Sequence, residues 1–107
     1  MKFRGKTEKG EWVYGGINEN GTCIIKNYQF IPVLPHTVGM CTGLKDVDGN
    51  LIYEGDVLQH IYDPTGDSSE IVFWNDSVGA FYTKRVRQPY TDTLYPEYLR
   101  KYMRIAV

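Results

Sequence analysis

The sequence predicts an all-β protein: a small SH3-like barrel with additional strands and at most one short helix near the C-terminus. Segments rich in β-branched and aromatic residues recur at roughly 8–12-residue spacing, which is typical of small barrels and sandwiches. Turn-forming residues separate these segments, and helical character is confined to residues 96–101. The length of 107 residues suits one domain, so we expect residues 1–107 to form a single unit.

The first predicted hairpin joins residues 11–17 to residues 22–26. Both segments are rich in β-branched residues, and the first is also aromatic. Between them lies Asn18-Glu19-Asn20-Gly21, which ends in Asn-Gly, the pair that best tolerates the positive φ angles of a type I′ turn. We therefore expect a tight turn at this position.

Residues 30–36 are predicted to form an edge or connecting segment. Pro32 and Pro35 exclude a central strand there, because proline has no N–H to donate to the ladder. Extended chain is expected again over residues 37–44. A proline-marked arm of this kind readily exchanges between subunits, which is one reason to expect self-association.

Two tight corners are predicted between residues 43 and 57, on either side of a short strand. Asp46 is placed to accept N–H bonds across the turn that Gly49 closes, as Asx-turn residues do. We expect positive φ at Gly49 or at the residue after it. Residues 54–56 form the second corner, which Asp56 ties together.

The second half of the chain predicts four more strands and one helix. Proline at the first turn and glutamate near the positive end of the helix dipole indicate a short helix over residues 96–101. The predicted strands cover residues 57–62, 70–74, 79–83 and 103–107, with a polar loop at 63–69 and irregular chain at 87–94.

Residues 42–57 read TGLKDVDGNLIYEGDV, which resembles the hallmark of the YopX-like family of bacteriophage and prophage proteins, a family without an assigned activity. FRGK and GEWVYG near the start, and IVFW and GAF later on, are similar to further parts of that family. Members continue beyond the position of Val107 with a Gly-Asn-Ile and an Asn-Pro-Glu-Leu ending. The resemblance therefore implies that the family's C-terminal tail is missing here, either naturally or by truncation.

The motif residues are expected to be structural. Glycines supply backbone freedom at corners, and carboxylates at turns commonly accept backbone N–H bonds. The residues concerned are Thr42, Gly43, Leu44, Asp46, Gly49, Tyr53, Glu54, Gly55 and Asp56.

No catalytic residue, metal site or cofactor is predicted, so we expect a protein that is not an enzyme. Cys23 and Cys41 form no CxxC pair and are interpreted as reduced thiols. His36 and His60 have no cysteine or carboxylate at ligand spacing. The sequence contains no Gly-x-Ser-x-Gly, P-loop or dinucleotide-binding motif.

The hydropathy of the chain predicts no association with a membrane. No apolar run reaches the roughly 20 residues that a membrane span needs. The basic start lacks the apolar stretch of a secretory signal. Together with the phage resemblance, this leads us to expect a location in the cytosol of a bacterial host.

The favoured function is that of a phage or prophage accessory protein acting as a non-enzymatic protein-interaction or self-assembling module. Small β domains with exposed edges commonly associate. The aromatic content of 14% is high enough that some large side chains should remain exposed. The expected partners are a second copy of the chain, forming a homo-oligomer, or an unidentified phage or host protein.

Nucleic-acid binding by a small β-barrel, through the basic and aromatic C-terminal third, is the alternative. Residues 51–76 carry six acidic residues and no basic one, whereas residues 77–107 carry six basic and two acidic residues. This asymmetry suits either a nucleic-acid contact or complementary faces within one surface or between two subunits. A net charge of −1 argues against nucleic acid. The possible contacts are Lys84, Arg85, Arg87, Arg100, Lys101 and Arg104.

Overall fold

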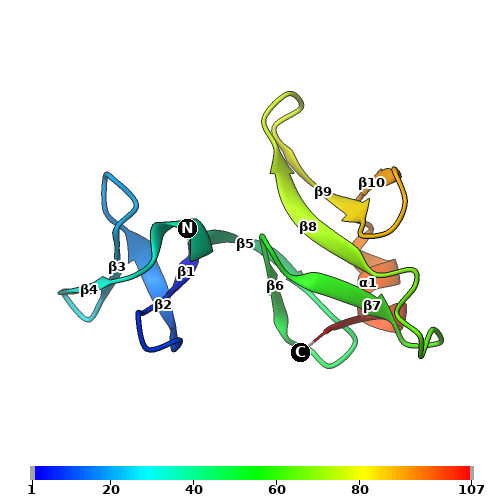
Figure 1. Ribbon diagram of the computed structural model, residues 1–107, viewed down its shortest axis with the longest axis horizontal. Helices are drawn as coiled ribbons and strands as arrows, with labels where there is room; N and C mark the ends of the chain where they lie inside the picture. Colours follow the sequence, from blue (N-terminus) through cyan, green and yellow to red (C-terminus); the bar gives the residue numbers. More distant parts are fainter. Residues whose placement is uncertain (1, 107) are drawn as a thin grey trace. The chain divides into compact units, whose positions relative to one another are not determined.

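Antiparallel strands make up most of the regular secondary structure (Figure 1). The computed structural model describes residues 2–106, in which eleven strands form two sheets and one α-helix lies near the C-terminus. The predicted all-β class with one short helix is confirmed. The strand order in each sheet is linear, so neither sheet closes into the expected SH3-like barrel.

The chain divides into two compact units, Met1–Cys41 and Thr42–Val107. Strand β5 (Gly39–Lys45) crosses the division. Its first residues pair with β1 (Phe3–Lys6) in the first unit, and it then leads into β6 (Leu51–Tyr53) of the second. Each unit is described by itself below.

The first unit is an antiparallel meander with a short 3₁₀ segment. Each of its first four strands pairs with the next, in the order β4-β3-β2-β1. Ile24 is fully buried and Val33 nearly so. The remaining elements are β2 (Trp12–Ile17), β3 (Cys23–Lys26), β4 (Gln29–Pro32) and the 3₁₀ segment Pro35–Thr37.

The predicted first hairpin is present as β2 and β3, but its turn differs from the expected type I′. Gly21 has a φ of 70°, whereas Asn20 does not have positive φ. The side chain of Asn18 organises the loop instead, because its Oδ1 accepts the N–H groups of Thr22 and Cys23 at 2.9 and 3.0 Å. An asparagine that bonds the backbone four and five residues ahead opens a wider loop.

The type I′ geometry occurs one turn later, between β3 and β4. Asn27 and Tyr28 both have positive φ, at 51° and 63°, and they are the only two residues between Lys26 and Gln29, which pair across the hairpin. Strand β4 forms an edge of its sheet, as predicted for this proline-containing segment. Its pairing with β3 was not predicted.

The second unit contains a five-stranded antiparallel sheet and the helix. Its strand order is β10-β9-β8-β7-β11. The predicted helix is present, and the predicted final strand is confirmed over Met103–Ile105. Ala106 lies beyond the strand, and Val107 lies outside the described residues. Strand β10 lies in chain predicted to be irregular. The bounds are β7 (Val57–His60), β8 (Glu70–Asn75), β9 (Ala80–Arg85), β10 (Thr91–Thr93), α1 (Pro96–Tyr102) and β11 (Met103–Ile105).

Helix α1 closes the core of the second unit over one face of this sheet (Figure 1). Leu99 of the helix and Met103, which follows it directly, are both buried. They pack with side chains from three strands, namely Ile52, Leu58 and Val72. Burying one such side chain contributes about 1.5–3 kcal/mol, so this cluster accounts for the position of the helix.

Candidate functional site

The first corner of the 42–57 motif is organised by a buried carboxylate. Asp46 is 2% exposed, and its Oδ1 accepts the N–H groups of Asp48 and Asn50 at 3.0 and 2.9 Å. Its Oδ2 accepts the N–H of Ile105 on β11 at 3.1 Å. Gly49 closes the turn with a φ of 82°, as predicted. The corner thereby joins its own turn to the last strand.

The second corner repeats this design. Gly55 has a φ of 92°, and the buried Asp56 accepts the N–H of Tyr53 through Oδ2 at 2.7 Å. The Thr42 hydroxyl donates to the carbonyl of Ile52 at 2.8 Å. The predicted pair of corners flanking a short strand is thus present, and the side chains of Asp46, Asp56 and Thr42 bind backbone groups there.

The remaining motif residues fit the same framework. Tyr53 is buried, and Leu44 packs against the core cluster. Gly43 has positive φ and lies exposed within β5, while Glu54 lies in the turn before Gly55.

Four of the six basic residues predicted as nucleic-acid contacts form ion pairs within the chain. Arg87 pairs with Asp67 at 3.0 Å, which joins the acidic middle of the chain to its basic end within one molecule. Arg104 pairs with Asp48 at 2.8 Å, and this hydrogen bond raises the pKa of the guanidinium. Arg100 and Lys101 both pair with Glu97 on α1, at 3.3 and 3.7 Å.

Lys84 and Arg85, the remaining two candidates, are neighbours on β9. Successive strand residues point to opposite faces of a sheet, so their side chains diverge. Lys84 is exposed, whereas Arg85 is half-buried and faces the side that α1 covers, where it lines a pocket. The structure thus separates these two predicted contacts from each other.

One pocket of the second unit lies between the ends of β8 to β10 and helix α1. Its volume is about 300 Å³. The sheet supplies a polar floor, which includes Glu70 of β8 and Arg85 of β9. Tyr90, Tyr95 and Tyr98 supply aromatic walls, and the buried Leu99 and Met103 belong to its apolar end.

Glu70 and Arg85 are directly opposite each other in the β8–β9 ladder. Glu70 accepts a hydrogen bond through Oε1 from the hydroxyl of Thr83, at 3.2 Å, and Thr83 is only 3% exposed. Among residues 2–106 the Arg85 side chain has no hydrogen-bond or ion-pair partner, and its Nε is fully buried. Its guanidinium carbon lies 5.3 Å from the ring centre of Tyr90. A half-buried cation therefore faces the pocket with its hydrogen-bonding capacity unused.

Asp92 anchors the tyrosine side of the pocket. Its carboxylate accepts hydrogen bonds from the hydroxyls of Tyr90 and Tyr95, at 3.2 and 3.4 Å. The bond to Asp92, together with its negative charge, raises the pKa of Tyr90. Tyr90 thus remains a neutral phenol at physiological pH, and both rings are held at the rim.

The model of the family described as YopX protein matches residues 2–105, which is nearly the whole chain. The protein is a member of the YopX family. Both described units fall within the match, as do the two corners built on Asp46 and Asp56. No curated protein gives a significant match to the chain.

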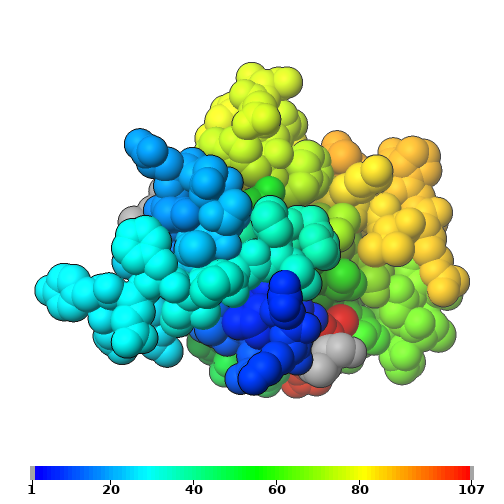
Figure 2. All heavy atoms as spheres, turned by 60° about the vertical axis from the view of Figure 1, so that its left-hand side comes forward, coloured from blue at the N-terminus to red at the C-terminus, as the bar shows by residue number. Residues whose placement is uncertain are grey.

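Besides the pocket, this YopX protein has an exposed aromatic surface at the tip of the β3–β4 hairpin. Tyr28 is fully exposed, and Phe30 on β4 is 63% exposed. Figure 2 shows the cyan hairpin segment projecting from the body of the first unit. Two large aromatic side chains therefore face solvent together at a free sheet edge.

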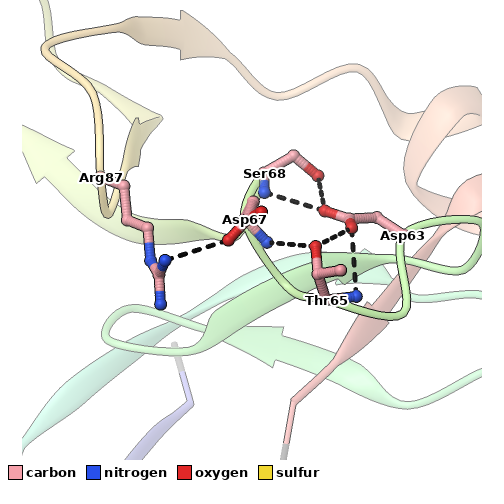
Figure 3. Close-up of polar contacts among 5 residues, drawn as sticks. All are labelled: Asp63, Thr65, Asp67, Ser68 and Arg87. Atoms are coloured by element: carbon pink, nitrogen blue, oxygen red, sulfur yellow. Dashed lines mark hydrogen bonds and ion pairs between the residues drawn. The ribbon is translucent and has the colours of Figure 1, made fainter.

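The 63–69 loop of the second unit is ordered by one aspartate (Figure 3). Asp63 accepts hydrogen bonds from the N–H and hydroxyl of Thr65, and likewise from both groups of Ser68. These bonds stabilise the carboxylate form and hold the pKa of Asp63 well below its usual range. Asp67 of this loop also carries the ion pair with Arg87 shown in the figure.

Sequence reasoning identified Arg85 as a candidate but missed the rest of the pocket. Glu70, Thr83 and Asp92 come together through strand register, which a single sequence does not reveal. The only sequence signal for the pocket was that Thr83 and Arg85, two residues apart on one strand, lie on the same face of the sheet. Within the described residues, no group of three His, Cys, Asp or Glu side chains is placed to hold a metal ion. None of the helices there has the length and apolarity to cross a membrane.

Proposed function

We propose that this YopX protein is a non-enzymatic protein-interaction module that self-associates through the β3–β4 hairpin. The observation that carries the proposal is the conformation of Tyr28. It is fully exposed and occupies a left-handed backbone conformation, with φ at 63°. Asparagine and glycine adopt this conformation readily, whereas a bulky residue does so at a cost of about 1–2 kcal/mol. Contact with a second molecule would offset that cost.

The hairpin register indicates how two copies would meet. Lys26 and Gln29 flank a two-residue turn and so form a hydrogen-bonded pair. Alternation along the ladder turns the backbone N–H and C=O of Phe30 outward, towards the free edge. Two copies related by a two-fold axis can pair their Phe30 residues antiparallel, and Pro32 limits the extent of pairing because it has no N–H.

Such a contact would be weak but measurable. Four aromatic rings, at about 150 Å² each and about 25 cal/mol per Å², give a gross gain of about 15 kcal/mol. Association costs about 4–15 kcal/mol in lost translational and rotational freedom. We therefore expect a reversible dimer rather than an obligate one.

Sedimentation velocity of the purified protein tests this proposal. The wild type should show a concentration-dependent species of twice the 12.3 kDa chain mass at roughly 50 µM. Tyr28→Gly combined with Phe30→Ser should abolish it. Tyr62→Ser is the matched control, because Tyr62 is a 74% exposed aromatic of the other unit. A wild type that sediments only at the chain mass at every concentration would overturn the proposal.

The biological setting belongs to the same proposal. Kinship with a phage and prophage family supports an accessory role in the cytosol of a bacterial host. An unidentified phage or host protein is then a further possible partner for the hairpin. The acidic and basic segments provide weaker support for a subunit contact, because Arg87 and Arg104 already pair within the chain.

Nucleic-acid binding is the second candidate, and one observation favours it. The side chain of Arg85 has no hydrogen-bonding partner among residues 2–106 and lies against the exposed ring of Tyr90. Arginine beside an aromatic ring is a common platform for unpaired bases. Single-stranded DNA at low salt tests it: binding that weakens in Arg85→Ala supports the candidate, and absence of binding by the wild type eliminates it.

A further inference from the structure

We propose that the pocket between β8–β10 and α1 binds a neutral, planar nucleobase, with guanine as the best match. The inference rests on the pocket alone. It holds whether or not the protein self-associates or contacts a phosphate backbone.

The charges that line the pocket exclude simple ions as its best ligands. Glu70 and Asp92 flank the single guanidinium of Arg85, so the lining is net negative. A free phosphate or carboxylate would be drawn to Arg85 but repelled by the two carboxylates. A cation would be attracted by the two carboxylates but repelled by Arg85. A neutral ligand that offers both an acceptor and donors avoids either penalty.

The ladder places the complementary groups side by side. Glu70 and Arg85 are directly opposite residues, whose Cβ atoms lie about 4.5–5.5 Å apart in an antiparallel pair. Arg85 has unused N–H donors, and Glu70 uses only Oε1, towards Thr83. The ligand must therefore present an acceptor beside one or two donors on a single edge. Guanine does so, because its O6 adjoins the N1–H and N2–H groups.

The walls fit a flat ring. Tyr90, Tyr95 and Tyr98 surround the polar floor, and Asp92 fixes two of them through their hydroxyls. Aromatic rings and guanidinium planes are the surfaces on which unpaired bases stack. A volume of about 300 Å³ lies at the small end of ligand pockets, so it suits a compact nucleoside better than an extended peptide.

The roles divide as follows. Arg85 donates to O6, Glu70 accepts from N1–H and N2–H, and the tyrosines cover the face of the ring. Adenosine lacks the O6 acceptor and reverses the pattern at N1, so it satisfies fewer of these groups. Uridine and cytidine each offer only one N–H-bearing position on this edge. We expect guanosine to bind about 10-fold or more tightly than the other three nucleosides.

NMR titration of ¹⁵N-labelled protein with the four neutral nucleosides tests the assignment. The buried Nε–H of Arg85 gives a side-chain signal inside the pocket. Guanosine should shift this signal and the amides around Glu70, with half-saturation below about 1 mM. Guanosine monophosphate should bind no more tightly than guanosine, because O6 of the base occupies Arg85 and the carboxylates of Glu70 and Asp92 repel the phosphate. If the monophosphate or single-stranded DNA alone binds, the ligand is a phosphate and the proposal fails.

Three variants sharpen the result. Glu70→Gln and Arg85→Lys should each lower the affinity for guanosine by about 5–100-fold, because each removes one side of the base-edge contact. Lys84→Ala, next to Arg85 but on the other face of β9, should leave binding unchanged. If a variant fails to fold, the relative affinities of the wild-type protein for the four nucleosides still test the proposal. The proposal would be overturned if all four nucleosides bound equally or if guanosine showed no saturable binding. It would also be overturned if a glutamine dipeptide amide, whose side-chain amide likewise places an acceptor beside a donor, bound as tightly as guanosine.

Discussion

Replacement of Asp46 measures how far the first corner of the 42–57 motif supports the fold of the second unit. The carboxylate is 2% exposed and accepts three backbone N–H bonds, from Asp48, Asn50 and Ile105. Hydrogen bonds to a charged group contribute about 1.5–3 kcal/mol each. In the variant, the N–H groups of the exposed Asp48 and Asn50 can form hydrogen bonds with water instead, whereas the N–H of Ile105 is partly buried. We therefore expect Asp46→Ala to lower the free energy of unfolding by about 3–5 kcal/mol.

Urea unfolding followed by circular dichroism provides the assay. A loss of this size is a large part of the 5–15 kcal/mol that stabilises a typical domain. Asp46→Asn should lower the free energy of unfolding by less. Its Oδ1 still accepts the two N–H groups of the turn, and only the bond to Ile105 is lost, because the NH₂ group cannot accept a hydrogen bond. Asp48→Ala is the control, since it removes only an exposed ion pair with Arg104, worth about 0–1 kcal/mol. A loss below about 1 kcal/mol for Asp46→Ala would refute the reasoning.

Two further predictions concern local structure. Gly15→Ala should separate β2 from β3, because the added Cβ would lie 2.2 Å from the carbonyl oxygen of Ile25; amide hydrogen exchange should then quicken in β3, and unchanged exchange would contradict this. Because the pKa of Asp63 is lowered in the folded protein, its contribution is present above the usual carboxylate pKa of about 4 and is lost as pH falls below it. The unfolding midpoint of the wild type should therefore fall more steeply below about pH 4 than that of Asp63→Asn, and parallel curves would contradict the prediction.

The features predicted correctly are those that local chemistry determines. The corners at Asp46 and Asp56 follow from carboxylates placed beside glycines, and α1 follows from proline and glutamate at its first turn. The prolines correctly indicated an edge strand, because a missing N–H has the same consequence in any fold.

The features that were missed depend on partners distant in the sequence or on unfavourable local choices. A tyrosine at positive φ gives no turn signal, so the Asn27–Tyr28 hairpin was not recognised, and the expected turn at Asn-Gly was displaced by the side chain of Asn18. The pocket exists because register brings Glu70 opposite Arg85. Barrel closure was expected from strand number and spacing, which do not determine how sheets end.

The most direct test of the proposed self-association is disulfide trapping at Phe30. With Cys23 and Cys41 replaced by serine, Phe30→Cys should form a dimer under mild oxidation, because a hydrogen-bonded antiparallel pair holds its Cα atoms about 5.5 Å apart, within disulfide range. Tyr62→Cys, in the same background, should remain a monomer. Rapid and selective dimerisation through position 30 is the result that the account predicts. Equal rates at positions 30 and 62, or no dimer at position 30, would contradict it.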